Sequence, residues 1–170
     1  PVFWILMIPV GLHLLAGGLG LSEVSTRSWG GFVLTLVLTM TSAIIALPLG
    51  IILAIGRQSK MVIIHRISRL YIDIIRSVPL ISVLFFGQLL IPLFLPMGLE
   101  LNRVLRAVLA FAIFCSAYIA EDVRGGLQSI PRTQKEAAEV LGLNPRQVLQ
   151  MVILPQALRI SLPALTNQAV

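Results

Sequence analysis

A short polar segment, TQKEAAEVLG, interrupts a chain that is otherwise strongly apolar. Thr133 stands three residues before Glu136, the spacing of a capping box in which each side chain satisfies a backbone amide of the other residue. Gly142 is suited to the left-handed conformation that commonly ends a helix. The pattern therefore predicts a short helix over residues 134–141, with a start signal and a stop signal encoded next to it.

The function expected of this helix is docking on another protein. A helix of this length is marginal in water unless another surface supports it. Ala137, Val140 and Leu141 form a small apolar patch, which suits insertion of the helix into a groove on another protein. A plain interhelical loop is the alternative. A second start signal directly afterwards, Asn144 followed by Pro145, argues against that alternative.

A line of small and hydroxylated residues lies within a long apolar stretch. Thr35, Thr39, Ser42 and Ala46 follow helical spacing, so they share one face. Small residues promote close packing of helices in membranes, and this is the interpretation that we favour. The alternative is that the line forms a polar wall of a solute path.

Two acidic residues, Glu121 and Asp122, end another apolar stretch, and Glu121 shares a helical face with Tyr118. Ionisable residues within membrane spans are usually functional, whereas those at span ends are mostly interfacial. We expect both acids to pair with Arg124 or with the basic inner surface. The residues considered for a substrate path are Thr35, Thr39, Ser42, Tyr118, Glu121 and Asn167.

The end of the chain contains two prolines that interrupt an apolar helix, Pro155 and Pro163, with Arg159 between them. Kinked helices leave backbone carbonyl groups open, which membranes tolerate only beside protein or a water-filled cavity. Part of the path wall is therefore expected near residues 157–167, which include Asn167.

The composition indicates a membrane protein. Hydrophobic residues make up 57% of the 170 residues and charged residues only 12%, against roughly 25% charged in soluble domains. Charge-free stretches at residues 1–22, 28–56 and 77–99 reach the ~20 residues that a spanning helix needs, a shorter one covers 104–120, and another begins near 147. Helices are expected because lipid offers backbone groups no partner. The predicted fold is an all-α polytopic transmembrane helical bundle.

The basic residues predict its orientation. Residues 57–76 hold five of them and residues 121–146 hold four, which places both segments on the cytoplasmic side. The segments around residues 23–27 and 97–103 should then face outward. Residues 57–79 suit an amphipathic helix at the inner interface, with Ile63, Ile67, Leu70 and Ile74 on its apolar face. The net charge of +6 is spread between spans and does not indicate binding to nucleic acid.

No catalytic group is expected. No Ser/His or His/carboxylate set can be proposed across the spans, no phosphate-binding loop with Gly-Lys-Ser/Thr is present, and no metal site is indicated. An intramembrane enzyme is therefore disfavoured. An ion-coupled secondary transporter or channel, which works without an ATPase partner, is the alternative function considered for a membrane protein of this kind. That alternative predicts carboxylates in mid-span positions, whereas the acids here lie at span ends.

Several motifs resemble a known family. EAAEVLG followed by ILPQALRISLPAL resembles the EAA loop of the membrane subunits of ABC importers. LTLVLT, GRQS, YIDIIRSVPL, AYIAEDVRGGLQSIP and KEAAEVLGL resemble, in this order, permeases for polar amino acids of the histidine, glutamine and arginine type. The resemblance runs from about residue 31 to residue 170. One departure is Ser77-Val78, where the family commonly has Gly-Thr.

The resemblance implies a type I ABC importer permease core over residues 30–170, with its cytoplasmic coupling loop at about 121–155. Residues 1–29 would be an extra N-terminal transmembrane helix and an outside loop, and the C-terminal core helix would be absent from this sequence. The short helix would be a coupling helix. The resemblance assigns ATPase docking to Thr133, Lys135, Glu136, Ala137, Ala138, Val140, Leu141 and Gly142.

The same resemblance implies the partners and the location. They are a cytoplasmic ABC ATPase dimer, a second permease subunit (identical or homologous), an extracytoplasmic amino-acid-binding protein and membrane lipid. No cofactor is expected in this chain, because ATP and Mg would be bound by the ATPase subunits. The expected location is the bacterial inner membrane, crossed several times.

Overall fold

A computed structural model describes residues 10–11, 13, 18–20, 22, 30–94, 96 and 101–168. Most of the expected extra helix over residues 1–22, and the expected outward segment 23–27, lie outside these residues. The described elements are η1 (Gly18–Gly20), α2 (Gly31–Arg57), α3 (Val62–Ser77), α4 (Leu80–Phe94), α5 (Arg103–Ser129), α6 (Arg132–Val140), α7 (Pro145–Gln147), the π-helix η3 (Val148–Ile153) and α8 (Leu154–Gln168). The prediction of an all-α fold is confirmed for this part of the chain.

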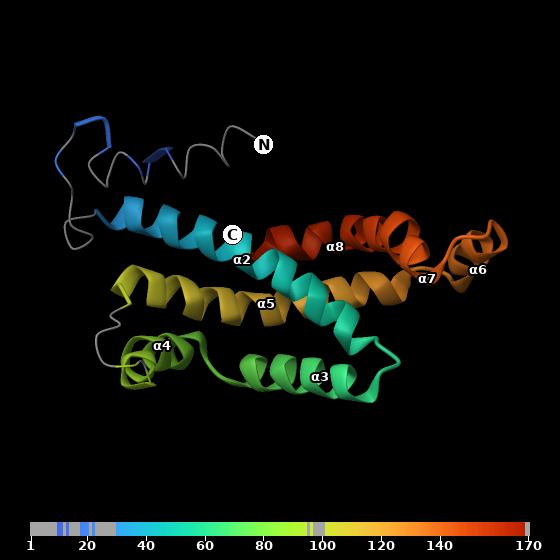
Figure 1. The fold of residues 1–170 in the computed structure, drawn as a ribbon, viewed down its shortest axis with the longest axis horizontal. Coiled ribbons are helices and arrows are strands. Elements are labelled where there is room, and N and C mark those ends of the chain that lie inside the picture. The colour runs from blue at the N-terminus through green and yellow to red at the C-terminus, as the bar shows by residue number, and fades with distance from the viewer. Residues whose placement is uncertain are drawn as a thin grey trace.

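The helix α5 lies at the centre of the bundle and packs against α2, α3, α4 and α8 (Figure 1). Short elements α6 and α7 lie together at one end of the molecule's long axis, which we name the α6 end. Within the described residues, the helical segments Gly31–Arg57, Arg103–Ser129 and Pro145–Asn167 are long and apolar enough to cross a membrane. The pair α3 and α4, bent by 104°, makes a fourth if it is counted as one broken span. These elements match the four apolar stretches expected after residue 28.

Small residues on α2 allow close approach to α5. Ser42 and Ala46 are buried there, and the Ser42 hydroxyl donates a hydrogen bond to the Val108 carbonyl at 3.3 Å. A Cβ atom added to Gly50 would lie 2.6 Å from Cγ2 of Ile119. The packing interpretation of this line is therefore confirmed for Ser42 and Ala46.

A second close crossing joins α5 to α8. A Cβ atom added to Gly126 would collide with the Ala157 carbonyl and with the Ser161 hydroxyl. The Ser161 hydroxyl also donates a hydrogen bond to the carbonyl of Asp122 at 3.0 Å. Because the backbones meet without an intervening side chain, the two helices form a firm joint near the α6 end.

The helix α3 is amphipathic as expected, and the side opposite its apolar stripe packs along α2 and α5 as part of the bundle (Figure 1). Ser68 and Ile72 are buried in this contact, and the Tyr71 hydroxyl donates a hydrogen bond to the Ile113 carbonyl at 3.0 Å. These inward-facing positions lie opposite the apolar stripe used for the prediction. The end of α3 agrees with expectation, since Val78 is extended before Pro79.

Pro155 interrupts regular helix geometry as expected, and the interruption takes the form of the π-helix η3 directly before α8. Proline has no amide hydrogen, so it removes one backbone hydrogen bond from the helix at its position. The Gln156 side-chain amide donates to the Val152 carbonyl at 2.9 Å. The expectation that Pro163 also interrupts the helix is wrong, because α8 continues through it to Gln168.

Candidate functional site

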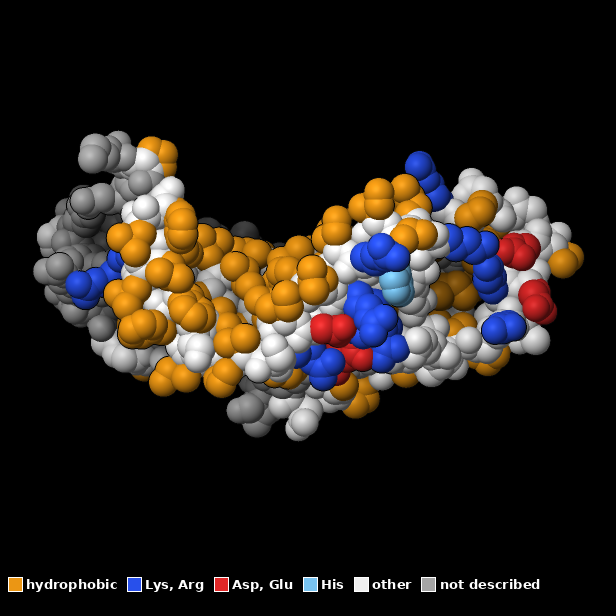
Figure 2. Space-filling view, turned by 90° about the horizontal axis from the view of Figure 1, so that it is seen from below, with side chains coloured by type: hydrophobic (Ala, Val, Ile, Leu, Met, Phe, Trp, Pro, Cys, Tyr) orange, Lys and Arg blue, Asp and Glu red, His pale blue; other side chains and the backbone are white. Residues whose placement is uncertain are grey.

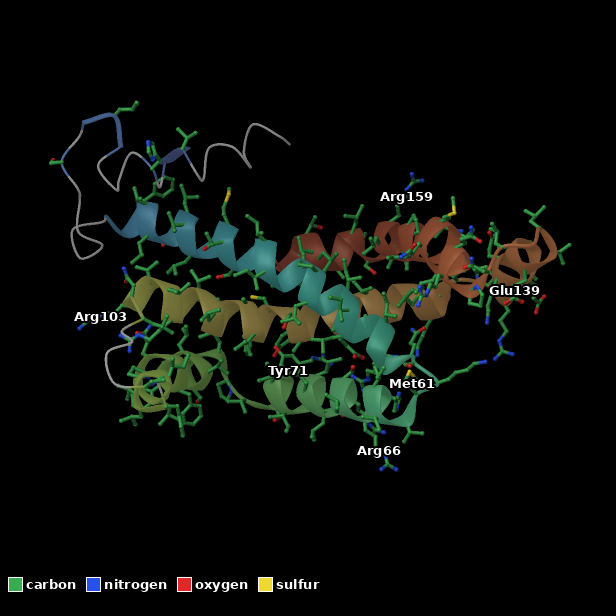
Figure 3. The ribbon with its side chains drawn as sticks, viewed as in Figure 1. Met61, Arg66, Tyr71, Arg103, Glu139 and Arg159 are labelled. Carbon is green, nitrogen blue, oxygen red and sulfur yellow. The ribbon has the colours of Figure 1, made fainter. Side chains whose placement is uncertain are left out.

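The short helix α6 is the first candidate site, because it projects at one end of the molecule, where Glu139 is labelled in Figure 3. It begins at Arg132 after an extended Pro131, and no side chain caps it. The predicted capping box is therefore wrong: Thr133 already lies in the first turn, because Pro131 supplies the extended residue that precedes the helix. The observed capping box is the next one, in which Asn144 and Gln147 cap α7.

The stop signal of α6 is confirmed. Gly142 has a φ angle of 79°. The Leu143 amide donates to the Ala138 carbonyl at 3.3 Å, and the Gly142 amide donates to the Glu139 carbonyl at 2.9 Å. This is a Schellman motif, which closes a helix when its C′ residue is left-handed.

The exposed surface of α6 combines apolar and charged side chains. Val140 and Leu141 are 87% and 80% exposed, and the exposed Lys135 forms an ion pair with Glu139 at 3.7 Å. Ala138, by contrast, is only 4% exposed and lies on the inward side of the helix. The other predicted docking residues are exposed: Thr133, Lys135, Glu136, Ala137, Val140, Leu141 and Gly142.

The chain connects α6 to the bundle through α7 and η3, and α6 packs on η3. η3 leads without a break into α8, which meets α5 at the Gly126 joint. A continuous set of packed helices thus connects α6 to the central helix α5.

The residues considered for a substrate path do not form one group. Ser42 is buried against α5, whereas Thr35, Thr39 and Asn167 are exposed on α2 and α8. Thr35 uses its hydroxyl to donate to the Gly31 carbonyl at 2.8 Å. Only Tyr118 and Glu121 are brought together, and Arg76 joins them.

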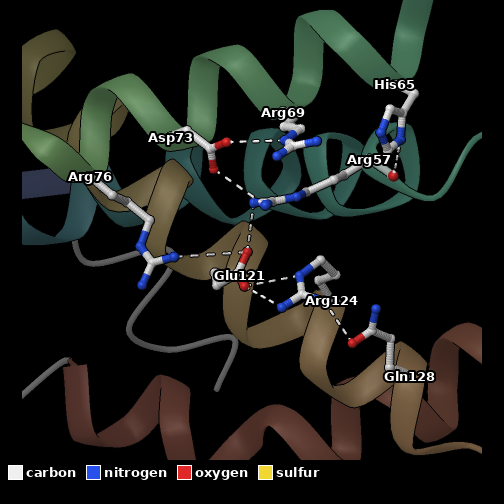
Figure 4. Close-up of polar contacts among 8 residues, drawn as sticks. All are labelled: Arg57, His65, Arg69, Asp73, Arg76, Glu121, Arg124 and Gln128. Carbon is white, nitrogen blue, oxygen red and sulfur yellow. Dashed lines mark hydrogen bonds and ion pairs between the residues drawn. The ribbon is translucent and has the colours of Figure 1, made fainter. Parts of the chain in front are cut away.

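Arg76 and Glu121 belong to a charge cluster, defined by Arg57, Asp73, Arg76, Glu121 and Arg124, that links three helices (Figure 4). Arg57, at the end of α2, donates to Glu121 at 2.9 Å and pairs with Asp73 of α3 at 3.3 Å. Arg124 donates to the other oxygen of Glu121.

Arg76 lies one turn after Asp73, near the C-terminal end of α3. Its guanidinium lies 3.9 Å from Glu121 and 5.2 Å from the centre of the Tyr118 ring. Glu121 thus forms ion pairs with three arginines. Only 20% of the Glu121 side chain and 19% of the Arg57 side chain are exposed. The arrangement ties α2, α3 and α5 together electrostatically.

The expected pairing of Glu121 with Arg124 is confirmed, as is the ion pair of Arg69 with Asp73 at 3.4 Å. The expectation for Asp122 is not met, because its buried Oδ2 atom has no hydrogen-bond partner among the described residues. Sequence reasoning missed Arg57 as a member of the cluster. A basic residue that ends an apolar helix was the available signal, but its partner is 64 positions away.

The chemistry that these two sites offer follows from their side chains. Among the described residues, no group of three or more His, Cys, Asp or Glu side chains lies together as metal ligands would. The charge cluster offers ion pairing between helices, and α6 offers an exposed apolar and charged surface for docking.

The family of binding-protein-dependent transport system inner membrane components matches residues 46–170 of the chain. The chain belongs to this family. The resemblance to permeases of ABC importers is thereby confirmed, and the described helices are those of such a permease.

Among the proteins similar to this chain are permeases of amino-acid transport systems. It is 47% identical over 88% of its length to the glutamate/glutamine/aspartate/asparagine transport system permease protein BztC of Rhodobacter capsulatus. It is 44% identical over 96% of its length to the inner membrane amino-acid ABC transporter permease protein YhdY of Escherichia coli. The chain spans 34% and 45% of these two relatives.

A solved structure agrees with the fold. The crystal structure of an amino acid ABC transporter with histidines superposes with a TM-score of 0.67 at 28% sequence identity. The match covers 98% of this permease chain and 70% of that chain.

Proposed function

We propose that the chain is the transmembrane permease part of an ATP-driven importer for polar amino acids, located in a bacterial inner membrane. The observation that carries this proposal is α6, a short helix with a firm stop and with Val140 and Leu141 exposed, at the end of a bundle that belongs to the permease family. The names of the relatives, which mention glutamate, glutamine, aspartate and asparagine, support the substrate class.

In this proposal α6 is a coupling helix that docks on a cytoplasmic ABC ATPase dimer. Lys135 and Glu136 would contact the rim of the ATPase groove, while Val140 and Leu141 would fill it. Gly142 lets the chain turn back directly at the docking edge, because its φ angle of 79° suits a residue without a side chain. Thr133 and Ala137 complete the exposed surface, and Ala138 supports it from within.

ATP and Mg would be bound by the ATPase subunits. Closure of the ATPase dimer would draw together the α6 helices of this permease and of a second one, identical or homologous. The motion would pass through η3 and α8 to α5 at the Gly126 joint, and the spans would switch from inward-facing to outward-facing. A binding protein would deliver the amino acid from outside.

The substrate path is proposed to pass Tyr118 and Glu121, which lie together in the structure, with Thr35, Thr39, Ser42 and Asn167 contributing in other states of the cycle. Residues 30–170 are proposed to form the permease core, with the coupling loop at about 121–155 and an additional segment before it at 1–29.

The test is ATP hydrolysis by the intact transporter in liposomes. We expect hydrolysis to rise when the binding protein and a polar amino acid are added together, and not with either alone, because only the loaded binding protein favours the outward-facing state. Uptake that continues without any ATPase subunit and responds to an ion gradient would instead identify a secondary transporter.

A further inference from the structure

One face of α3 carries four large apolar side chains that the rest of the described chain leaves exposed. They are Ile63, Ile67, Leu70 and Ile74, with exposed fractions between 50% and 72%. Their spacing of four, three and four residues places them on one stripe of the helix. The helix is attached to the bundle through its opposite side, so the stripe points away from α2 and α5.

Basic side chains border this stripe. Lys60, Arg66 and Arg69 are exposed there, and across residues 57–76 five basic residues face one acid, Asp73. Arg69 pairs with Asp73 at 3.4 Å, whereas Lys60 and Arg66 form no ion pair within the described ranges. Figure 2 shows the band of charged side chains directly beside an apolar surface.

The apolar stripe and its basic edge suit an anionic lipid better than a second copy of the chain. An apolar stripe with Lys and Arg along its edge is the pattern of helices that lie at a membrane interface and attract anionic lipids. A second copy of the chain is disfavoured, because a two-fold contact through the stripe would bring Arg66 and Arg69 of both copies near one another.

The position of the stripe along the molecule also favours a lipid as its occupant. Met61 and Arg66 lie toward the same end as Glu139 of α6, and Arg103 lies toward the opposite end (Figure 3). Tyr71, which follows Leu70 in the chain, lies nearer the middle of the long axis. The basic edge of α3 is thus near the end of the bundle, where headgroups would be, while the later part of the stripe extends toward the middle.

We propose that α3 carries a binding site for an anionic phospholipid. Lys60, Arg66 and Arg69 hold the phosphate-bearing headgroup, and an acyl chain lies along Ile63, Ile67, Leu70 and Ile74. Since α3 also joins the charge cluster through Asp73, occupation of this site stabilises the attachment of α3 to α2 and α5.

The test uses the intact transporter in bilayers of phosphatidylcholine and phosphatidylglycerol in equal parts, with a trace of either lipid made photoactivatable. We expect the phosphatidylglycerol probe to label α3 in preference to the phosphatidylcholine probe. The double variant Lys60→Gln/Arg66→Gln should reduce that labelling by at least about tenfold, because each basic residue near an anionic surface contributes about fivefold, equivalent to ~1 kcal/mol. Arg103→Gln, which removes a cation at the opposite end, should leave it unchanged.

Four results would overturn the proposal. Equal labelling of α3 by both probes would show that the site does not prefer anionic lipid. Full labelling of the double variant would show that Lys60 and Arg66 do not hold the headgroup. Cross-linking of Ile67→Cys to a second copy or another subunit, in a Cys115→Ala background, would make the stripe a protein interface. Displacement of the lipid probe by excess inorganic phosphate, which lacks an acyl chain, would show that the site takes a free anion.

Discussion

Replacement of Gly142 by valine is expected to abolish transport while the protein still inserts into the membrane. Gly142 has a φ angle of 79°, where a β-branched residue costs on the order of 2 kcal/mol. The chain after α6 would have to leave this conformation, and the Schellman hydrogen bonds to Ala138 and Glu139 would be lost. A cost of ~2 kcal/mol lowers the ratio of correctly placed to displaced α6 by about thirtyfold. Uptake by reconstituted transporter measures the effect.

Two controls separate backbone conformation from the loss of a glycine as such. Gly142→Asn should keep most transport, because asparagine tolerates the left-handed conformation. Gly125→Val is the matched variant on α5, since a Cβ atom at Gly125 meets no atom within 4 Å and its φ angle is ordinary. Normal uptake by Gly142→Val would show that the helix stop does not matter for coupling.

Replacement of Glu121 by alanine is expected to destabilise the bundle by about 2–3 kcal/mol. The change leaves Arg57, Arg76 and Arg124 facing one another without the carboxylate that they share, and Arg57 keeps only Asp73 as a partner. We place the effect below that of a fully buried pair, because these side chains keep some exposure to solvent. Unfolding of the purified protein in detergent, followed by helix content, measures the change.

A second variant tests whether the loss comes from unpaired charge. Glu121→Leu combined with Arg76→Met should be more stable than Glu121→Leu alone, because it removes a cation whose ion pair with Glu121 has been lost. Glu139→Ala serves as the control, since its ion pair with Lys135 is exposed and contributes under about 0.5 kcal/mol. If Glu121→Ala and Glu139→Ala have equal stability, the cluster does not hold α2, α3 and α5 together.

The features that could be predicted from the sequence are those that depend on a few neighbouring residues. Gly142 ends α6 and Asn144-Pro145 starts α7 because capping and left-handed stops are local. Pro79 ends α3 because it restricts the residue before it. The membrane spans follow from long apolar stretches, in which lipid leaves helices as the available structure.

The features that could not be predicted depend on contacts between distant segments. Thr133 and Glu136 have capping-box spacing, but Pro131 already provides the residue before the helix. The side of α3 that packs on the bundle was not evident from the sequence. Its most apolar stripe is exposed, whereas the buried side contains Ser68 and Ile72. For the same reason the partnership of Arg57 with Glu121 appears only once the packing of α2 on α5 is known.

The most direct test of the account is a cross-link from α6 in the intact transporter. A photoreactive residue at Leu141, which is 80% exposed, should cross-link to the subunit that hydrolyses ATP, and one at Arg103, toward the opposite end of the bundle, should not. Cross-linking of Leu141 to the transmembrane helices of its own chain, or to the external binding protein, would contradict the assignment of α6 as the coupling helix.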